Sequence, residues 1–501
     1  MHFLDFCTSK KCVRRNNVKK ISFFKNYSIF LQKCLVFRIL LLPLHRFSEI
    51  LNKIRYKMNK KSIISAMLLL SSASVFAGGI LENTNQSVKF LRNPSQDGAI
   101  GIDGVYSNPA GVAFLNDGFH LEFNWMMVHQ DRDTWSGYSS LFNYNINNAN
   151  LPALNDKNQR KFEGDVDVPI QPSLFLAYNK NRWSFQFGFG FVGGGGGCEF
   201  KNGLGSFEAL VGSMGMNQLG ATFAGYGMKS YMKGTSYDLG LTFAAARKIT
   251  DKLSVSAGLR GIILMNNYEG YLRDIQFATV AGTVMDIPTE YVLDCKQRCF
   301  GIAPIIGVDY KANDHWNFAA KYEFRTKLTA KTTSSNNDAF ETLAGSQPSF
   351  KAYTDGAESA QDLPGYLTAG VQYSPIKSVR ILGGYHHFFD VDTRQYYKDQ
   401  VHDTNEMTFG AEWDITKHIE VSGGMQKTWY DLDDSFQSDA NFILNSYSLG
   451  CGVGVNVSEK IKLNLAYFQT NYTNKTVETA QSLVKYRRTN RLVAVGVDIN
   501  F

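Results

Sequence analysis

Cysteine is too scarce in this sequence to hold the fold together. The 501 residues include seven cysteines, and those beyond residue 77 are Cys198, Cys295, Cys299 and Cys451. Four cysteines are too few for a disulfide framework in so long a chain. Cys295 and Cys299 flank three polar residues that we expect in a surface loop, where a local bridge and two free thiols are equally compatible with the sequence. No histidine or further cysteine stands near them at zinc-ligand spacing, so we expect no metal site.

Positive charge is also lacking once the amino-terminal region is set aside. The whole chain carries a formal charge of +7, of which residues 1–77 carry +13, and subtracting the second from the first leaves −6 on residues 78–501. Without a broad excess of positive charge, counterion release cannot drive binding to nucleic acid. We therefore expect no nucleic-acid partner.

Motifs for nucleophilic catalysis are absent as well. The sequence has no Gly-x-Ser-x-Gly segment, and a hydrolase needs a nucleophile next to an oriented base. The most evident histidine cluster is His386-His387. Neighbouring residues of a strand point to opposite faces, so this pair cannot chelate one metal and is better interpreted as a polar pair at an interface or in a lumen. We expect no catalytic residues, no cofactor and no enzyme activity.

Apolar runs long enough for a membrane-spanning helix are missing too. The run at residues 29–42 is interrupted by two basic residues, whereas a spanning helix needs about 20 apolar residues in succession. Residues 58–77 combine two lysines, a short apolar core and small residues near the end, which is the layout of a secretory signal peptide. We interpret residues 1–57 as a mis-assigned start, and the alternative is a membrane anchor or basic targeting arm.

What the chain does have, from residue 119 onward, is period-two alternation, which places successive side chains on opposite faces of a β-strand. In residues 183–191, five aromatic side chains alternate with serine, glutamine and glycine. A water-soluble sheet would not expose such a face. The last segment has the same pattern, and the residues of its apolar face are Val493, Val495, Val497, Ile499 and Phe501.

Fourteen segments carry this alternation, and their connections alternate between six tight turns and seven long loops. This arrangement is typical of a transmembrane β-barrel. A soluble β-sandwich is the alternative, but the polar second face of each segment favours lipid outside and a polar lumen inside. The segments are residues 119–131, 168–179, 182–192, 231–248, 252–265, 299–311, 315–330, 362–374, 378–391, 402–414, 418–431, 444–457, 460–472 and 491–501.

The region before the first segment has a different character. A fourteen-stranded barrel has a lumen too wide for its own side chains to fill. Residues 78–118 lack alternation and contain turn-forming Asn-Pro and Gly-rich segments, so we expect them to form a plug, or hatch, inside a barrel of residues 119–501. The predicted fold is an all-β, 14-stranded antiparallel transmembrane β-barrel with an N-terminal hatch.

A short motif within this region resembles a known family. Asn108, Pro109, Ala110 and Gly111 closely resemble the Asn-Pro-Ala-Gly segment at the end of the hatch in the FadL family of outer-membrane transporters for long-chain fatty acids and other hydrophobic compounds. The resemblance implies capture of a hydrophobic substrate at the outer surface and its exit through a side opening at an inward kink of the third strand. The four motif residues either shape the hatch or contact the ligand.

Glycines at the end of the third segment are candidates for that kink. Gly188 and Gly190 lie on the lumen face of the segment, and Gly193, Gly194 and Gly195 begin a run of five glycines. Glycine weakens strand pairing and permits bulges. A lateral opening and the start of a flexible loop are equally compatible with this run.

Apolar residues in the loop after the third segment are candidate ligand contacts. Phe207, Leu210 and Met214 have helical spacing in a loop that should face outward. They either contact a captured ligand or pack against another loop. The family's capture groove is ascribed to later loops, here residues 266–298 and 331–361, whose content is only moderately apolar, so the groove is left unassigned.

The sequence therefore predicts a monomeric transporter in the outer membrane of a Gram-negative bacterium, with the lipid bilayer and a hydrophobic small molecule as partners. The C-terminal Phe501 is the expected signal for the barrel-assembly machinery. A general diffusion porin and a structural or adhesive barrel are the alternatives. We expect the lumen residues Arg380, Lys321, Glu323, Arg325, Glu406 and Glu412 either to conduct polar solutes or to anchor the hatch. The identity of the cargo and the direction of transport stay open.

Overall fold

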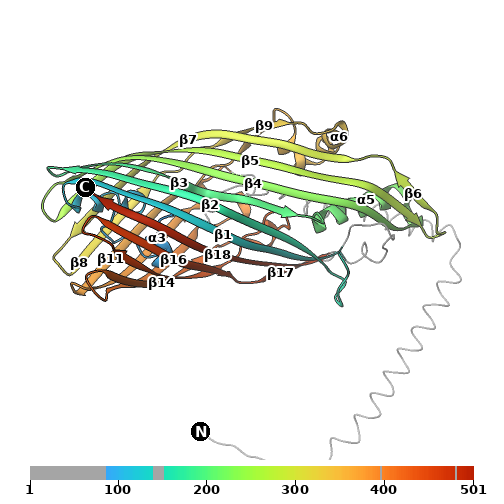
Figure 1. Cartoon of the computed structure of the whole chain (residues 1–501). Coiled ribbons are helices and arrows are strands. Elements are labelled where there is room, and N and C mark those ends of the chain that lie inside the picture. Colours follow the sequence, from blue (N-terminus) through green and yellow to red (C-terminus); the bar gives the residue numbers. More distant parts are fainter. Residues whose placement is uncertain (1–85, 139–151, 395–397, 480–481) are drawn as a thin grey trace, which may run out of the picture. The chain divides into compact units, whose positions relative to one another are not determined.

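A computed structural model of the chain describes residues 86–138, 152–394, 398–479 and 482–501 (Figure 1). The interpretation of residues 1–57, the signal peptide at residues 58–77 and the first part of the expected hatch, residues 78–85, lie outside the described residues. Among the described residues, no helix is long and apolar enough to cross a membrane.

Strands dominate the described chain and join in one sheet of eighteen strands. Four of them are short and extend the loops: β6 (Val284–Ile287), β9 (Thr329–Ser334), β10 (Glu358–Ala360) and β17 (Lys475–Glu478). The fourteen long strands are β1 (Gly118–Tyr138), β2 (Arg160–Lys180), β3 (Trp183–Phe200), β4 (Phe223–Lys248), β5 (Leu253–Thr279), β7 (Tyr291–Lys311), β8 (Trp316–Glu323), β11 (Gly365–Ile376), β12 (Val379–Phe389), β13 (Thr404–Asp414), β14 (Ile419–Trp429), β15 (Ser446–Asn456), β16 (Ile461–Tyr472) and β18 (Ser482–Asn500).

The sheet closes on itself. Each long strand pairs antiparallel with the long strand before it and the one after it, and β1 pairs with β18 from His120 opposite Asn500 to Tyr138 opposite Ser482. Closure leaves no strand edge unpaired at the ends of the sheet, which a hydrocarbon environment demands. The fourteen-stranded antiparallel barrel expected from the sequence is confirmed.

Several strands, among them β1, β2, β4, β5, β7 and β18, extend seven or more residues further toward the long loops than expected, and two other differences bear on the site. β3 continues through the glycine run to Phe200, so the expectation that this strand ends at residue 192 is wrong. The expected strand at residues 315–330 is divided, because β8 ends at Glu323 and β9 begins at Thr329. β9 pairs with β7 and β10 beyond the end of β8, so the chain makes a separate hairpin there.

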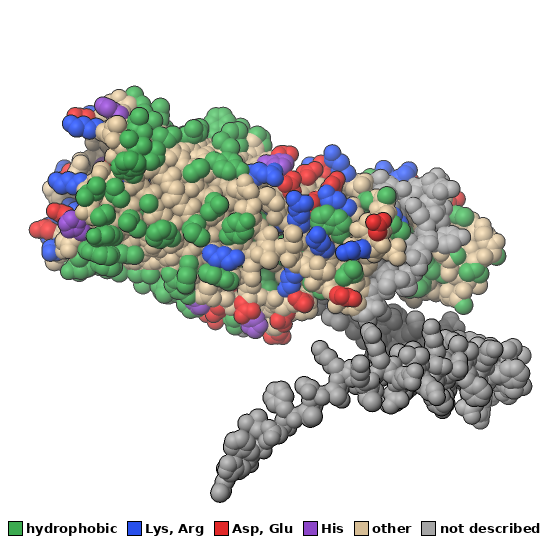
Figure 2. Space-filling view, turned by 90° about the horizontal axis from the view of Figure 1, so that it is seen from below, with side chains coloured by type: hydrophobic (Ala, Val, Ile, Leu, Met, Phe, Trp, Pro, Cys, Tyr) green, Lys and Arg blue, Asp and Glu red, His purple; other side chains and the backbone are tan. Residues whose placement is uncertain are grey.

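The two faces of the barrel differ as the alternation predicts. In Figure 2, hydrophobic side chains spread over the barrel wall, and charged side chains gather on either side of this area. The inward face carries buried polar residues such as Glu122, Asn124 and Asp309. Outward-facing large hydrophobic side chains include Phe123, Trp125, Phe185, Phe243, Leu259, Ile263, Ile302, Phe318, Phe409, Leu449, Leu463 and Val495.

The expected surface loop around Cys295 and Cys299 is wrong, because both residues lie within β7. Four residues of extended strand span on the order of 13 Å at about 3.3 Å per residue. A disulfide needs Cα atoms within about 7 Å of each other, so these two thiols cannot form a local bridge. Both are free, with Cys295 buried and Cys299 half-buried.

Among the described residues the helices are short, and the longest is in the loop after β3. α5 (Gly205–Leu219) follows β3, and α6 (Asp338–Ser346) follows β9 at the same end of the barrel (Figure 1). The long strands β4, β5 and β7 reach this end, which we call the long-loop end. The remaining helical segments are α3 (Val88–Arg92), α4 (Gly104–Ser107), η1 (Gly111–Phe114), η2 (Gly220–Thr222), η3 (Pro348–Tyr353), η4 (Asp390–Asp392), η5 (Lys398–Gln400) and η6 (Asp434–Phe436).

Residues 86–117, here called the N-terminal segment, lie inside the barrel. Their side chains and backbone hydrogen-bond to inward-facing residues of β1, β3, β7, β8, β12, β13, β14 and β16. A segment that contacts strands all the way round a closed barrel can only occupy its lumen. Ser87 begins α3 by accepting a hydrogen bond from the backbone of Lys89, as an N-cap serine does.

Candidate functional site

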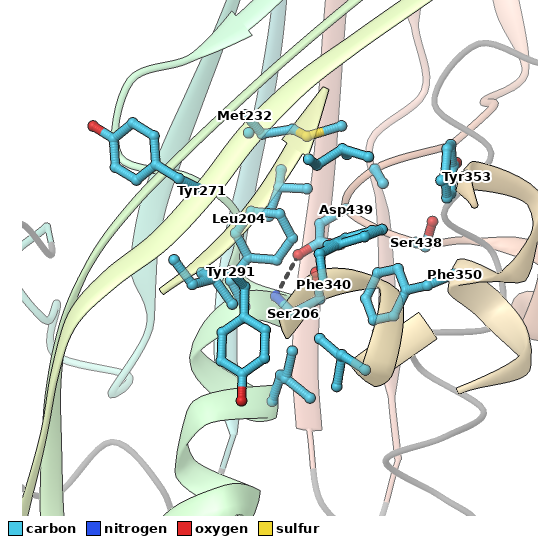
Figure 3. Close-up of a pocket in the computed structure, with 17 residues that line it drawn as sticks. Leu204, Ser206, Met232, Tyr271, Tyr291, Phe340, Phe350, Tyr353, Ser438 and Asp439 are labelled. Carbon is cyan, nitrogen blue, oxygen red and sulfur yellow. Dashed lines mark hydrogen bonds between the residues drawn. The ribbon is translucent and has the colours of Figure 1, made fainter. Parts of the chain in front are cut away.

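An apolar pocket of about 680 Å³ opens among the loops at the long-loop end (Figure 3). We call it the loop pocket. It lies between α5, the ends of β4, β5 and β7, the segment from α6 to η3, and residues 438–440. Its apolar side chains are Leu204, Phe207, Leu210, Met232, Leu272, Leu293, Phe340, Leu343, Phe350 and Ala440, with the rings of Tyr271, Tyr291 and Tyr353.

The structure places two of the three expected ligand contacts in this pocket. Phe207 and Leu210 line it, whereas Met214 packs against the same hydrophobic cluster without lining the pocket. The helical spacing of these residues corresponds to α5. The two expectations for the loop, contact with a ligand and packing against another loop, thus coexist. α5 packs on β4, β1 and β5, and it shares one hydrophobic cluster with α6 across the pocket.

A buried ion pair fixes α5 to the barrel. Arg160 Nε lies 2.8 Å from Glu208 Oε1, and both side chains are almost fully buried. Burial raises the pKa of Glu208 to about 8, although the nearby Arg160 guanidinium acts in the opposite direction. At neutral pH the carboxyl is therefore mostly protonated, and its contact joins a neutral group to the buried Arg160 guanidinium, so removing Glu208 takes a partner from a buried charge. The position of α5 beside the pocket therefore depends on this pair.

The Asn108 motif makes a turn inside the barrel. Asn108 Oδ1 accepts a hydrogen bond from the backbone of Gly111 at 3.0 Å, and its Nδ2 donates to Asp309 Oδ2 at 2.5 Å. Gln186 of β3 donates to the carbonyl of Pro109 at 2.8 Å. The next motif residue, Ala110, is buried. These bonds tie the motif to β3 and β7, which favours a shaping role over contact with a ligand.

Three further groups of polar contacts hold the N-terminal segment to the wall. Arg92 contacts Glu420 and donates to Ser422 at 2.9 Å. Lys89 Nζ lies 3.1 Å from Asp498 Oδ2. His386 bridges Asp97 of the segment, at 2.7 Å, and Glu406 of β13, at 2.6 Å. The expected polar role of His386 is therefore an anchor, and His387 points away from it toward Asn405 at 2.9 Å.

Most of the expected lumen residues take part in this anchoring. Lys321 donates to the carbonyl of Tyr106 at 2.7 Å, and Glu412 accepts from Gln96 of the segment at 3.1 Å. Glu323 pairs with Arg260, and Arg380 links Glu412 to Glu420 beneath Arg92. Arg325 differs, because it lies beyond the end of β8 and contacts Asp392 at the long-loop end.

The ladder between β2 and β3 is interrupted. Leu174 pairs with Phe189, and the next pair along the strands is Asp165 with Glu199. Residues 166–173 of β2 and 190–198 of β3 form no ladder pairs with each other, and we call this stretch the seam. The seam is packed rather than hollow, since a Cβ at Gly196 would lie only 2.7 Å from Val168 Cγ2.

The sequence explains why pairing fails there. Pro169 and Pro172 in β2 have no backbone N–H to donate, and proline is confined to strand edges and bulges. The register of β1 against β2 also shifts beside these prolines. On the opposite side of the seam, Gly194 and Gly195 have φ of +65° and +115°, which only glycine adopts without strain, and the register of β3 against β4 shifts twice in this run.

Gln86 of the N-terminal segment spans the seam from inside. Its side-chain Oε1 accepts a hydrogen bond from the backbone N–H of Phe191 in β3 at 2.9 Å. Its backbone carbonyl accepts from Ser173 Oγ in β2 at 2.6 Å. Gln86 therefore satisfies a donor of β3 that a continuous ladder would have paired with β2. Behind the seam, a smaller pocket of about 260 Å³ is lined by Gln86, Tyr106, Phe175, Gly188, Gly190 and neighbouring residues.

Sequence reasoning missed four residues of this arrangement. Pro169 and Pro172 indicate an interruption of the sheet, because proline inside an alternating segment marks a strand edge or a bulge. Gln86 and Asp439, which accepts a hydrogen bond from the backbone of Ser206 in the loop pocket, carried no signal, because their partners lie about one hundred and two hundred residues away.

Many solved structures match this fold, and three of them are described here. A crystal structure of a Pseudomonas aeruginosa FadL homologue matches with a TM-score of 0.58 and 12% identity, over 85% of this chain and 100% of that chain. A deltaS2S3 mutant of the TodX monoaromatic hydrocarbon channel has a TM-score of 0.56 and 15% identity, over 83% of this chain and 99% of its own. The toluene transporter TodX of P. putida has a TM-score of 0.53 and 15% identity, over 80% of this chain and 94% of its own. No family model and no curated protein sequence matches the chain.

The likeness covers the barrel and the segment within it. Each match extends over at least four fifths of this chain, so it includes the wall as a whole rather than a few hairpins. At these identities the comparison concerns the fold. The chain therefore has the fold of the FadL homologue and the TodX channel, a closed antiparallel barrel of fourteen long strands with an N-terminal segment ahead of the first.

Proposed function

We propose that this protein transports hydrophobic small molecules across the outer membrane of a Gram-negative bacterium. The molecule binds in the loop pocket, moves past the N-terminal segment and leaves sideways into lipid through the seam between β2 and β3. The observation that carries the proposal is the seam, because unpaired backbone in a barrel wall is costly in hydrocarbon. In this wall the unpaired stretch is bridged by Gln86 of the N-terminal segment. β2 and β3 can therefore separate there without breaking ladder hydrogen bonds.

The loop pocket supports the capture step. In outer-membrane barrels the long loops face outward and the short turns face the periplasm. The pocket therefore faces the medium, where an apolar surface such as that of Phe207 and Leu210 binds hydrophobic molecules. Each methylene that a ligand buries contributes about 0.8 kcal/mol, so a long-chain or aromatic molecule needs no specific polar contact to bind.

The seam supports the exit step. Gly188 and Gly190 line the small pocket behind it, and Gly193, Gly194 and Gly195 form the bulged part of β3 beside it. A hydrophobic molecule in the small pocket is separated from lipid by two strands that touch through side chains without ladder hydrogen bonds. Moving Gln86 aside removes its two hydrogen bonds at the seam, one with Phe191 of β3 and one with Ser173 of β2.

A general diffusion porin is disfavoured by the N-terminal segment. Its contacts with strands around the lumen, among them those of Lys89, Arg92 and Asp97, place it across the path that a polar solute would need. A structural or adhesive barrel would need neither the seam nor the loop pocket. Both remain outcomes that the uptake experiment distinguishes.

Two substrate classes fit the proposal at this level. Long-chain fatty acids are the class implied by the Asn108 motif, and monoaromatic hydrocarbons are the class named for TodX. Both are hydrophobic, as is the lining of the loop pocket. We propose that the protein acts as a monomer, and that the exposed C-terminal Phe501 is the segment recognised by the barrel-assembly machinery.

The proposal is tested by uptake into Gram-negative cells that produce the protein, since a lipopolysaccharide surface slows the direct entry of hydrophobic molecules. Labelled toluene and labelled palmitate are compared with sucrose, and cells that lack the protein provide the baseline. We expect faster entry of at least one hydrophobic probe and no change for sucrose. Faster entry of sucrose with no change for either hydrophobic probe would establish a porin instead.

A further inference from the structure

The loop pocket contains one acidic side chain within an apolar lining (Figure 3). Among the seventeen described residues that line it, none is lysine, arginine or histidine, and Asp439 is the only one with a charged side chain. The other polar members are serines and tyrosines, which carry no charge at neutral pH. The described lining of the pocket therefore has one acidic group and no basic one.

Asp439 is held in place by the start of α5. Its Oδ2 accepts a hydrogen bond from the backbone N–H of Ser206 at 2.6 Å, and Figure 3 shows the carboxylate directed at Ser206 beside Leu204 and Phe340. Asp439 is only 4% exposed. Burial raises the pKa of this carboxyl, while hydrogen bonds from Ser206 and the adjacent backbone lower it. The compensating groups are thus neutral dipoles at a helix N-terminus rather than a cation.

This arrangement has a consequence for a bound molecule. A second carboxylate in the pocket would face Asp439 with no positive side chain in the lining to offset the repulsion, and like charges repel more strongly in a partly buried site than in water. A hydroxyl, by contrast, can donate to the carboxylate, which has about four lone-pair sites. Asp439 already accepts hydrogen bonds from Ser206 and the adjacent backbone, and a hydroxyl of the ligand adds a further donor to a carboxyl group that has no cationic partner among the described lining residues.

We propose that the loop pocket selects uncharged hydrophobic molecules with a hydroxyl donor, such as long-chain alcohols or phenols, and discriminates against fatty-acid anions. The inference rests on the proposed function, because it names the substrate class that the capture pocket of the transporter takes. Of the two substrate classes named above, fatty acids and aromatic molecules, it favours those that carry no charge. Asp439 acts in it as the residue that determines specificity.

The test uses three probes with chains of similar length: 1-decanol, which is uncharged and donates; methyl nonanoate, which is uncharged and cannot donate; and decanoate, which is an anion. Binding to the purified protein in lipid nanodiscs is measured at pH 8 and corrected for partition into empty nanodiscs. We expect 1-decanol to bind most tightly and decanoate at least about tenfold more weakly, with methyl nonanoate between them.

The variant Asp439→Asn keeps an oxygen acceptor for Ser206 and removes the charge. We expect it to bind decanoate within about threefold of 1-decanol, because the repulsion is gone. The matched control is Asp434→Asn, an acidic residue of the same loop that pairs with Lys475 outside the pocket, and it should leave the ratio unchanged. Should Asp439→Asn fail to fold, the order of the three probes on the unaltered protein still decides the matter.

Equal binding of decanoate and 1-decanol to the unaltered protein would overturn the inference, and so would an unchanged ratio in Asp439→Asn. In either case, protein-dependent uptake of a hydrophobic probe by cells would show that the transport function itself stands. If none of the three probes binds, the specificity inference falls together with the capture step at this pocket. Uptake without pocket binding would then place substrate entry elsewhere on the barrel.

Discussion

Replacing Gln86 by alanine should speed the exit of substrate through the seam. The side chain of Gln86 accepts the hydrogen bond of Phe191 N–H at 2.9 Å, and alanine cannot accept it. One hydrogen bond of this kind contributes about 0.5–1.5 kcal/mol net, which changes the equilibrium between a closed and a parted seam about two- to twelvefold. The backbone carbonyl of Gln86 keeps its hydrogen bond from Ser173, so the substitution removes one of the two hydrogen bonds that Gln86 makes at the seam.

The assay is the initial rate of protein-dependent uptake of a labelled hydrophobic probe into cells, normalised to the amount of protein in the outer membrane. We expect Gln86→Ala to raise the rate by a factor within about the two- to twelvefold range. The matched control is Gln96→Ala, which removes the same side chain from the same segment but loses bonds to Asn93 and Glu412, away from the seam.

The reasoning is refuted if Gln86→Ala transports at the unaltered rate, or if Gln96→Ala accelerates uptake as much. The first result would mean that the seam does not part during transport. The second would mean that general loosening of the N-terminal segment, rather than the bond at the seam, controls the rate. Entry of sucrose in Gln86→Ala cells alone would show that the lumen, not the wall, had opened.

Further predictions concern the strands of the seam and the loop pocket. Replacing both Pro169 and Pro172 by alanine restores two N–H donors to β2, so the ladder should extend across the seam and uptake should slow; faster uptake would contradict this account. Leu210→Ala should weaken binding of a hydrophobic probe by about 1–2 kcal/mol, whereas Met214→Ala, which does not line the pocket, should leave binding nearly unchanged in the same titration. Because burial raises the pKa of Glu208 to about 8, above its unfolded value of about 4.5, the neutral carboxyl favours the folded loop below pH 4.5 and this stabilisation is lost as the pH rises to 8. Hydrogen exchange in α5 should therefore quicken over that window in the unaltered protein and not in Glu208→Gln, and equal pH dependence in both would disprove it.

The strands could be predicted from sequence because each carries its own signal. In β18, Val493 and Val495 face outward while Ala494 faces the lumen, and the pattern needs no knowledge of the neighbouring strand. Order in the chain then fixes order in the barrel, since each strand pairs with the next and β1 meets β18. Fourteen strands and the closed antiparallel barrel follow from local alternation alone.

The seam could be predicted only in part, because it depends on what two strands present to each other. The glycine run of β3 was visible, but its effect depends on Pro169 and Pro172 lying opposite in β2. A kink and a flexible loop are equally compatible with the glycine run, since such a run alone does not reveal whether the strand continues to Phe200. The end of β3 was placed too early for the same reason.

The site contacts across the lumen could not be predicted, because they join residues far apart in the chain. Asn108 meets Asp309, and Asp97 meets His386, through contacts that local patterns do not encode. Cys295 was placed in a loop because polar residues follow it, yet β7 extends beyond the membrane-spanning length and keeps these residues in a strand. Strand extension into the loop region depends on pairing with β5, which the sequence alone does not show.

A reversible cross-link between β2 and β3 can show whether substrate leaves through the seam. A Cβ at Gly190 would lie 3.4 Å from the Cβ of Ser173, close to the separation of about 3.5–4.5 Å in disulfides. The double variant Ser173→Cys, Gly190→Cys can therefore join β2 to β3 at the seam. The matched control is Gly188→Cys, Thr242→Cys, where the same 3.4 Å separation joins β3 to β4, two strands already paired at that point.

The measurement is uptake of a labelled hydrophobic probe before and after reduction of the cross-link, with the unaltered protein treated in the same way. We expect the oxidised seam variant to be blocked and its transport to return on reduction, while the oxidised control variant transports normally. Transport by the oxidised seam variant at the rate of its reduced form would contradict the account, because substrate would then be leaving by a route that does not part β2 from β3.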